Sequence, residues 1–157
     1  MSRRATLYKK GMLASSFQCL HCHYHVSTEP LYAGVQNRNH CPYCLWSCHL
    51  DLYSAGDRLS ACKAGMKPIG LTLKRSRNKY QPEPRGELML VHACADCATV
   101  SINRIAADDD PETILFIFES SLDVDQADFY DQQGIVMLDV EDAKVVHAQL
   151  FGQGALT

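Results

Sequence analysis

The stretch QNRNHCPYCLWSCHLD, residues 36–51, holds three cysteines and two histidines within sixteen positions. Two of these cysteines, Cys41 and Cys44, form a CxxC pair. A CxxC turn places two sulfurs on one side of a tight knuckle, at a separation suited to tetrahedral zinc with Zn–S bonds of about 2.3 Å. These side chains either perform chemistry or organise a small domain around a metal, and the second possibility would determine the fold.

The other cysteines repeat the same pattern. Two further CxxC pairs are Cys19/Cys22 and Cys94/Cys97, and Cys48 and Cys62 complete the eight cysteines. No apolar h-region follows the first basic residues, so we expect no secretory signal, and disulfides are then disfavoured. Three CxxC pairs in a chain of 157 residues predict zinc binding, with an iron–sulfur cluster as the minor alternative.

Two tetrahedral zinc ions need eight ligands, which seven cysteines and one histidine provide. The predicted ligands are Cys19, Cys22, Cys41, Cys44, His49, Cys62, Cys94 and Cys97. Because protein side chains fill both sites, neither keeps an open position for hydrolytic chemistry. We therefore expect two structural zinc ions per chain and no catalytic residue.

The spacing allows two pairings of these ligands. Cys41-x2-Cys44-x4-His49 reproduces the first three spacings of a CCHC zinc knuckle, which Cys62 closes. The stretches SFQCLHCHYHVS and LVHACADCATVS, around the other two CxxC pairs, resemble each other. We therefore favour an interleaved arrangement, in which these two pairs share the other ion as a zinc ribbon and Cys48 is a spare thiol. The alternative is sequential: Cys19/Cys22 with Cys41/Cys44, and His49 or Cys48 with Cys62 and Cys94/Cys97.

Short motifs in a fixed order extend beyond the ligands. They are FxCxxC at 17–22, RNHCP at 38–42, HLD at 49–51, GDR at 56–58, GMKPI at 65–69, VHxCxxC at 91–97, NR at 103–104 and DD at 108–109. Over about residues 17–110 the chain thereby resembles the RNHCP family. The resemblance implies a zinc-binding domain and assigns no biochemical role. After Cys22 and Cys97 the chain departs from the family pattern, because His23 and Ala98 replace an expected glycine.

The patterns outside the cysteine motifs predict the remaining elements. Apolar runs at 88–94 and 98–106 predict strands around the last CxxC pair, and the basic, proline-containing segment 73–87 predicts an exposed loop between two strands. The sequence Asp110-Pro111-Glu112 predicts a helix start with a capping aspartate. The last expected elements are an acidic helix at about 123–132, a strand at 135–140 and a helix at 141–151 that ends before Gly152.

These elements predict a small α+β zinc-binding domain built of zinc-ribbon-like β-hairpins with short helices. Its expected parts are a flexible basic arm at 1–16, an RNHCP-like zinc-binding domain at 17–110 and an acidic, mainly helical extension at 111–157 packed on it. No run of about 18 apolar residues is present, so we expect no membrane span. The expected location is cytoplasmic, with organelle targeting by the basic arm as the alternative.

Charge is divided unevenly along the chain. Residues 1–105 contain 14 Lys/Arg and 6 Asp/Glu, a formal charge of +8, whereas residues 106–157 contain 1 and 12, a formal charge of −11. A basic body indicates a polyanionic partner, here RNA or a ribonucleoprotein. The alternative is that the two parts neutralise each other within one fold.

The favoured function is a zinc-organised module that binds RNA, in a ribosomal context. The candidate nucleic-acid contacts are Arg38, Arg58, Lys74, Arg75, Arg77, Lys79, Arg85 and Arg104, together with the basic arm. One alternative is a protein–protein adaptor that docks through the acidic C-terminal segment. A second is a metal-dependent HNH-like nuclease in which His40, beside Asn39, activates water. The spacing matches no nuclease signature, so we lean against an enzyme.

Overall fold

The computed structural model describes residues 16–29, 31, 34–35, 38–50, 59–74, 86–123, 130 and 133–152. The elements with defined bounds are β1 (Ser16–Gln18), β2 (His25–Ser27), β3 (Ser47–Cys48), β4 (Gly65–Lys74), β5 (Glu87–Cys94), β6 (Val100–Arg104), α3 (Pro111–Ser121), a 3-10 turn at Val140–Asp142 and α5 (Ala143–Phe151). Antiparallel strands with two short helices confirm the predicted α+β class.

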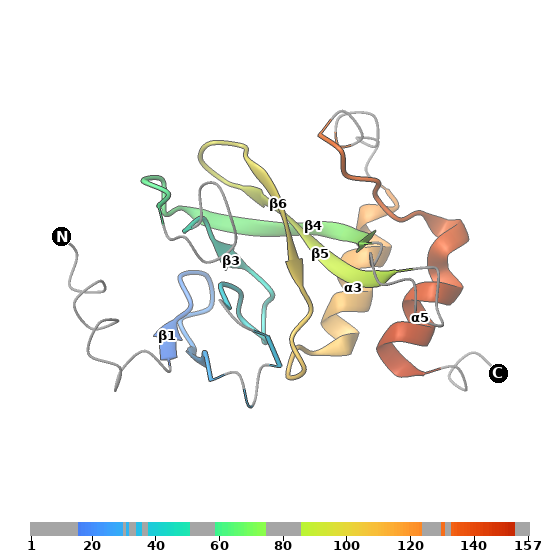
Figure 1. Ribbon diagram of the computed structural model, residues 1–157, viewed down its shortest axis with the longest axis horizontal. Helices are drawn as coiled ribbons and strands as arrows, with labels where there is room; N and C mark the ends of the chain where they lie inside the picture. The colour runs from blue at the N-terminus through green and yellow to red at the C-terminus, as the bar shows by residue number, and fades with distance from the viewer. Residues whose placement is uncertain are drawn as a thin grey trace.

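Strands β3 to β6 form one antiparallel sheet in the order β3-β4-β5-β6, and β1 pairs with β2 in a separate hairpin. The long central pair runs from Met66 opposite Cys94 to Lys74 opposite Glu87. The predicted strands on either side of the last CxxC pair are therefore confirmed as β5 and β6. Figure 1 shows β1 and β3 at one end of the sheet and the helices at the other.

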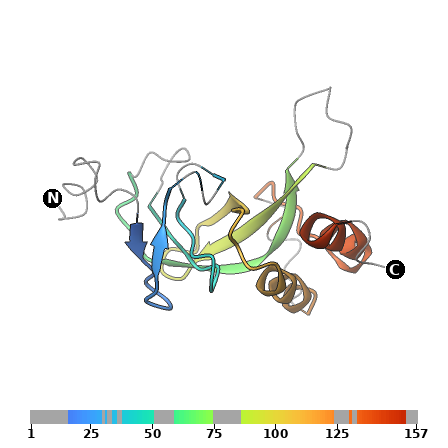
Figure 2. The same ribbon diagram turned by 90° about the horizontal axis from the view of Figure 1, so that it is seen from below.

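The main hydrophobic core lies at the helical end. Apolar residues of the sheet pack there against α3 and α5, which lie next to each other in both views (Figures 1 and 2). The buried members of this core are Leu45, Leu71, Leu88, Leu90, Ile114, Ile117, Phe118, Leu138 and Val146. A second, smaller buried cluster surrounds the first two CxxC pairs, where Cys19 and Cys41 pack with Val26. The helices therefore share a core with the sheet, and the β1–β2 hairpin packs on cysteine side chains instead.

The start of α3 is where the sequence predicts it, with Pro111 in the first turn. Asp110 occupies the N-cap position, but its side chain does not cap the helix backbone; it accepts a hydrogen bond from the Thr113 hydroxyl at 2.6 Å. The predicted final helix is confirmed as α5, preceded by the 3-10 turn and ended by Gly152 at a φ of 87°. Most of the acidic helix expected at 123–132 lies outside the described residues.

The strand predicted at 135–140 is wrong. This segment follows the edge of β4 beyond the short strand β3, where two hydrogen bonds hold it: Leu138 N–H donates to Leu71 O at 2.9 Å, and the Thr72 hydroxyl donates to Val136 O at 2.7 Å. A ladder needs regular backbone pairs on alternate residues. One backbone bond and one side-chain bond cover part of the β4 edge without forming a strand.

A buried ion-pair network ties the chain before the second CxxC pair to the start of α3. The Arg38 guanidinium donates to His40 O at 2.9 Å, and contacts Asp108 at 2.8 Å and Asp109 at 2.9 Å. The second oxygen of Asp109 accepts from Ala106 N–H at 2.8 Å and lies 2.6 Å from His40 Nε2. The side chains of Arg38 and Asp109 are both 0% exposed. Each buried charge is therefore paired, as burial requires.

We predict that Asp109→Ala lowers the free energy of unfolding by about 3–5 kcal/mol, because it leaves Arg38 buried with only partial compensation. The matched control is Arg104→Ala, which breaks the exposed Arg104–Glu87 pair and should cost less than about 1 kcal/mol. Urea unfolding of the metal-loaded variants measures both changes. If both variants lower the free energy of unfolding by the same small amount, the buried network does not stabilise the fold more than an exposed ion pair does.

Candidate metal centres

The three CxxC pairs share one backbone pattern. In each, the N–H of the first cysteine donates to the carbonyl five residues later, at 2.9 Å for Cys19, 2.9 Å for Cys41 and 2.8 Å for Cys94. The carbonyl of that cysteine accepts from the N–H four residues later, at 2.9, 2.9 and 3.2 Å respectively. We call each such six-residue turn a knuckle: residues 19–24, 41–46 and 94–99. The pattern closes a tight turn that brings the two sulfurs to the same side.

A fourth knuckle is split by an insertion. His49 N–H donates to Ala64 O at 2.9 Å, and Lys63 N–H donates to His49 O at 3.1 Å. These are the two bonds of a knuckle in which His49 stands at the first ligand position and Cys62 at the second. In the sequence, residues 50–61 separate the two halves. The sequence conceals this knuckle because its two ligands are far apart along the chain.

Left-handed backbone marks the same point in all four knuckles. The positive-φ non-glycine residues among those described are His23 (67°), Leu45 (64°), Lys63 (53°) and Ala98 (60°). Each follows the second ligand of its knuckle directly. A positive φ is sterically unfavourable for a residue with a Cβ atom, so the hydrogen bonds of the surrounding turn must stabilise it. His23 and Ala98 therefore adopt the conformation for which the family pattern uses glycine.

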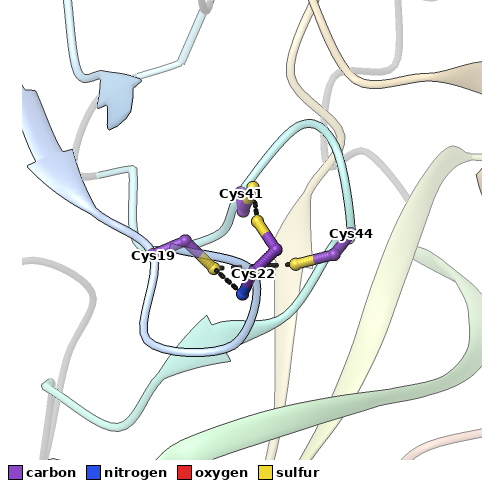
Figure 3. A group of neighbouring side chains, drawn as sticks. All are labelled: Cys19, Cys22, Cys41 and Cys44. Atoms are coloured by element: carbon purple, nitrogen blue, oxygen red, sulfur yellow. Dashed lines mark hydrogen bonds between the residues drawn. The ribbon is translucent and has the colours of Figure 1, made fainter. Parts of the chain in front are cut away.

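The first centre combines the knuckles 19–24 and 41–46. All four ligand atoms of Cys19, Cys22, Cys41 and Cys44 lie within 4.8 Å of one another. Figure 3 shows the four sulfurs pointing toward one another; Cys19 and Cys44 are 3.6 Å apart, as are Cys22 and Cys41. Tetrahedral zinc with bonds of about 2.3 Å requires sulfurs about 3.8 Å apart, so the arrangement fits one zinc ion.

The second centre combines the split knuckle with the knuckle 94–99. The ligand atoms of His49, Cys62, Cys94 and Cys97 also lie within 4.8 Å of one another. Cys62 and Cys94 sulfurs are 3.5 Å apart, and Cys97 Sγ lies 3.3 Å from His49 Nδ1. A CCCH set of this size fits a second zinc ion. The chain can thus hold two zinc ions, as predicted from the ligand count.

The two centres differ in exposure, and each contains both raised and lowered thiol pKa values; the lowered ones are those of Cys19 in the first centre and Cys97 in the second. Burial raises the pKa of the Cys41 thiol to about 11 and moves that of Cys44 in the same direction. At the exposed Cys97, hydrogen bonds with the side chain (3.2 Å) and the backbone of Thr99 lower the pKa of the thiol to about 6. The pKa of the Cys62 thiol in the second centre is also raised, to about 11, so metal binding at either centre displaces protons from thiols that are otherwise protonated at neutral pH.

The interleaved pairing favoured by the sequence is wrong, and the sequential alternative is correct. Strand β3 lies between Cys44 and His49, and an extended strand separates residues by about 3.3 Å each, so the two ligands face different sites. The sheet register places Cys48 opposite Gly65 and Met66 opposite Cys94. This register gathers His49, Cys62 and the 94–97 pair at one end of the sheet. Cys48 belongs to neither cluster, and its sulfur lies 3.3 Å from Lys63 O.

Two histidines that are not ligands, His40 and His92, are buried near the metal centres and form hydrogen bonds inside the protein. His92 is fully buried; its Nε2 lies 2.7 Å from Leu45 O and its Nδ1 2.9 Å from the Asn103 amide nitrogen. Burial lowers the pKa of His92 to about 3, so the ring is neutral, with the proton on Nε2. His40 is buried against Asp109 in the ion-pair network, and its exposed fraction is 2%. Neither histidine is placed to activate a solvent water.

The predicted nucleic-acid contacts are distributed as follows. Arg38 is a correction: its guanidinium is buried and is used in the ion-pair network, so it cannot reach a phosphate. Arg104 is exposed and pairs with Glu87 at 3.0 Å. Lys74 is exposed at the end of β4. The other five, Arg58, Arg75, Arg77, Lys79 and Arg85, lie outside the described residues.

Fold and site together define a small α+β protein with two closed four-ligand Cys/His centres suited to zinc. A family model described as the RNHCP domain matches residues 14–115, and the chain belongs to that family. No significant match was found among curated proteins or among solved structures. Among the described residues, no helix is both long and apolar enough to cross a membrane.

We predict that the purified protein contains two zinc ions per chain, measured by elemental analysis. Cys62→Ser should lower the content to one ion, because it removes one of four ligands from the second centre. The matched control is Cys48→Ser, which changes a cysteine of neither cluster and should retain both ions. One zinc, or iron, in the parent protein would contradict the two-zinc assignment.

We also predict that Ala98→Gly raises the free energy of unfolding by up to about 1 kcal/mol, because glycine adopts a positive φ without steric cost. Ala95→Gly, in the same turn but without a positive φ, is the control and should lower stability. Thermal unfolding of the zinc-loaded variants provides the comparison. Destabilisation by both changes would show that the left-handed turn at residue 98 carries little strain.

Proposed function

We propose that the eight Cys/His residues ligate two zinc ions, and that the resulting module binds RNA through its basic hairpin. This proposal rests on the position of the Lys/Arg residues relative to the strands of the sheet. Register pairs Lys74 with Glu87 at one end of the β4–β5 hairpin and Met66 with Cys94 at the other. Residues 75–86 therefore connect the strands at the end remote from the second centre.

This connection is strongly basic. Together with Lys74, the last residue of β4, it contains five Lys/Arg up to and including Arg85, against the single acid Glu83 within that span. Such a cluster interacts with phosphates regardless of sequence, and its contribution to binding depends on salt concentration. A ribosomal or other ribonucleoprotein context would supply RNA of this kind. The closed ligand sets favour binding over hydrolysis, because zinc-assisted hydrolysis uses an open coordination position.

A nuclease receives less support from the geometry. The proposed base would be His40, whose side chain is 3% exposed and whose Nε2 lies 2.6 Å from Asp109. A general base must come within hydrogen-bond reach of the water that it deprotonates. His40 instead contributes to the network that stabilises the start of α3.

A protein–protein adaptor is the second candidate, and an apolar groove favours it. The groove, of about 790 Å³, lies between β4, α3 and the segment 137–140. Phe116 and Val140, at its rim, are 67% and 70% exposed. Acidic residues 106–157 would suit a basic partner there. Capture of a protein that resists ribonuclease treatment and high salt distinguishes this candidate from RNA binding.

We predict that replacing Lys74, Arg75 and Arg77 with alanine weakens RNA binding for all sequences alike. The slope of log affinity against log salt should fall in magnitude by about 0.7 for each phosphate interaction removed on single-stranded RNA. Zinc content and melting temperature should change little, because exposed charges contribute little to stability. Fluorescence anisotropy with labelled RNA at several salt concentrations gives the slope.

The matched control is Lys144→Ala, which removes the single Lys/Arg of the acidic section, residues 106–157. Its salt slope should equal that of the parent protein. If the triple variant also binds RNA with the parent affinity and salt slope, the loop does not contact RNA and is only a solvated connector. The protein–protein adaptor then becomes the favoured function.

A further inference from the structure

Two aromatic pairs join the knuckles of the first centre. The His21 and Trp46 rings stack in parallel, with centroids 4.3 Å apart and planes 2° from each other. The Tyr24 and Tyr43 rings are tilted by 53° with centroids 5.3 Å apart. His21 and Tyr43 each stand two residues after the first cysteine of their knuckle, and Tyr24 and Trp46 each stand five residues after it. The knuckles therefore contact each other reciprocally, position two of one against position five of the other.

The tyrosine pair is much more exposed than bracing between the knuckles requires. Tyr24 is 63% exposed and Tyr43 is 59% exposed, whereas Trp46 in the other pair is half-buried. Leu20, at the tip of the first knuckle, adds an apolar side chain that is 49% exposed. The sequence offered a signal for this surface, because aromatic side chains recur at the same two offsets in both knuckles.

Knuckle geometry by itself does not require aromatic residues. The second centre is built from the same turns, yet the equivalent positions hold Asp96 and Thr99 in the knuckle 94–99, and Ala64 ends the split knuckle. Those residues are small or polar, and the ligands still converge within 4.8 Å. Among the described residues, these two aromatic pairs thus belong to the first centre, and metal binding by itself does not explain them.

Charge indicates what this surface meets. Residues 1–50 contain five Lys/Arg and one acid, Glu29, and one of the five, Arg38, is neutralised inside the protein. The other four precede β1, which leads directly into the first knuckle. Exposed aromatic rings that follow these basic residues in the sequence match a nucleic-acid strand, since unpaired bases stack on aromatic rings while phosphates contact cations. Asp110, whose N–H donates to Pro42 O at 3.2 Å, is an exposed acid beside the second knuckle.

We propose that Tyr24 and Tyr43, held in place by the first metal centre, form a stacking platform for unpaired bases of single-stranded RNA. The inference rests on the proposed RNA function but not on the β4–β5 loop. Every base has a flat π-face, so the platform favours single strands over duplexes and discriminates weakly among sequences. Assembly of the platform requires the first metal ion, because each tyrosine belongs to a different knuckle.

The test compares three double variants of the full zinc-loaded chain: Tyr24→Ala/Tyr43→Ala, Tyr24→Leu/Tyr43→Leu and Tyr24→Phe/Tyr43→Phe. The leucine variant retains apolar contact between the knuckles but has no ring, and the phenylalanine variant retains the ring. Phe116→Ala, at an exposed aromatic on α3, is the control. The probes are a short oligoadenylate and an RNA duplex of equal length, and zinc content verifies each protein.

The alanine and leucine variants should bind the oligoadenylate about 5-fold to 100-fold more weakly than the parent, with an unchanged salt slope. The phenylalanine variant and Phe116→Ala should bind as the parent does, and the duplex should compete poorly. Parent-like binding by a leucine variant that holds two zinc ions overturns the platform and leaves the proposed function standing. If the parent protein fails to bind RNA at low salt, both the platform and the proposed RNA-binding function are overturned. If the alanine and leucine variants instead lose a protein partner that resists ribonuclease treatment, the surface binds protein and not RNA.

Discussion

Convergence of four ligand atoms within 4.8 Å, at two places, is the constraint on which the structure depends. Thiolates this close repel one another. A divalent cation bound between them compensates this repulsion, and its binding contributes on the order of ten kcal/mol per ion. The same demand forces four non-glycine residues into left-handed backbone, each directly after the second ligand of a knuckle. Strain and repulsion are thus concentrated where the metal can offset them.

The sheet connects these centres to an ordinary hydrophobic core. Strand β5 begins among the leucines packed by α3 and α5 and ends at Cys94, a ligand of the second centre. The Arg38–Asp109 pair provides a second connection, from the segment before the second knuckle to the start of α3. Removal of metal should therefore disturb the knuckle end first, while the helical end retains apolar burial of its own.

Because protein side chains fill both centres, the proposed functions assign recognition to surfaces other than the metal sites. Two such surfaces lie on the cysteine-rich end and the hairpin: the Tyr24–Tyr43 pair and the basic connection after Lys74. A third, the groove beside Phe116, extends from α3 to Cys44 and Trp46 of the second knuckle and differs in chemistry. An RNA and a protein partner would contact different side chains under these proposals, and substitutions confined to one set of side chains at a time separate the two.

The sequence by itself determined which eight Cys/His side chains form the two clusters, the strands around the last CxxC pair, the start of α3 and the helix before Gly152, because each is encoded by short-range spacing or by capping and turn residues. It did not determine the pairing of the ligands. Similarity between the knuckles at Cys19 and Cys94 suggested a shared ion, yet similar turns occur in both centres and carry no information about partners. The antiparallel register of β3, β4 and β5 decided the pairing, because it brings His49, Cys62 and Cys94 to one end of the sheet. Likewise, only the tertiary structure showed that Arg38 faces Asp109 inside the protein, since burial of a charge depends on a partner 71 residues away along the chain.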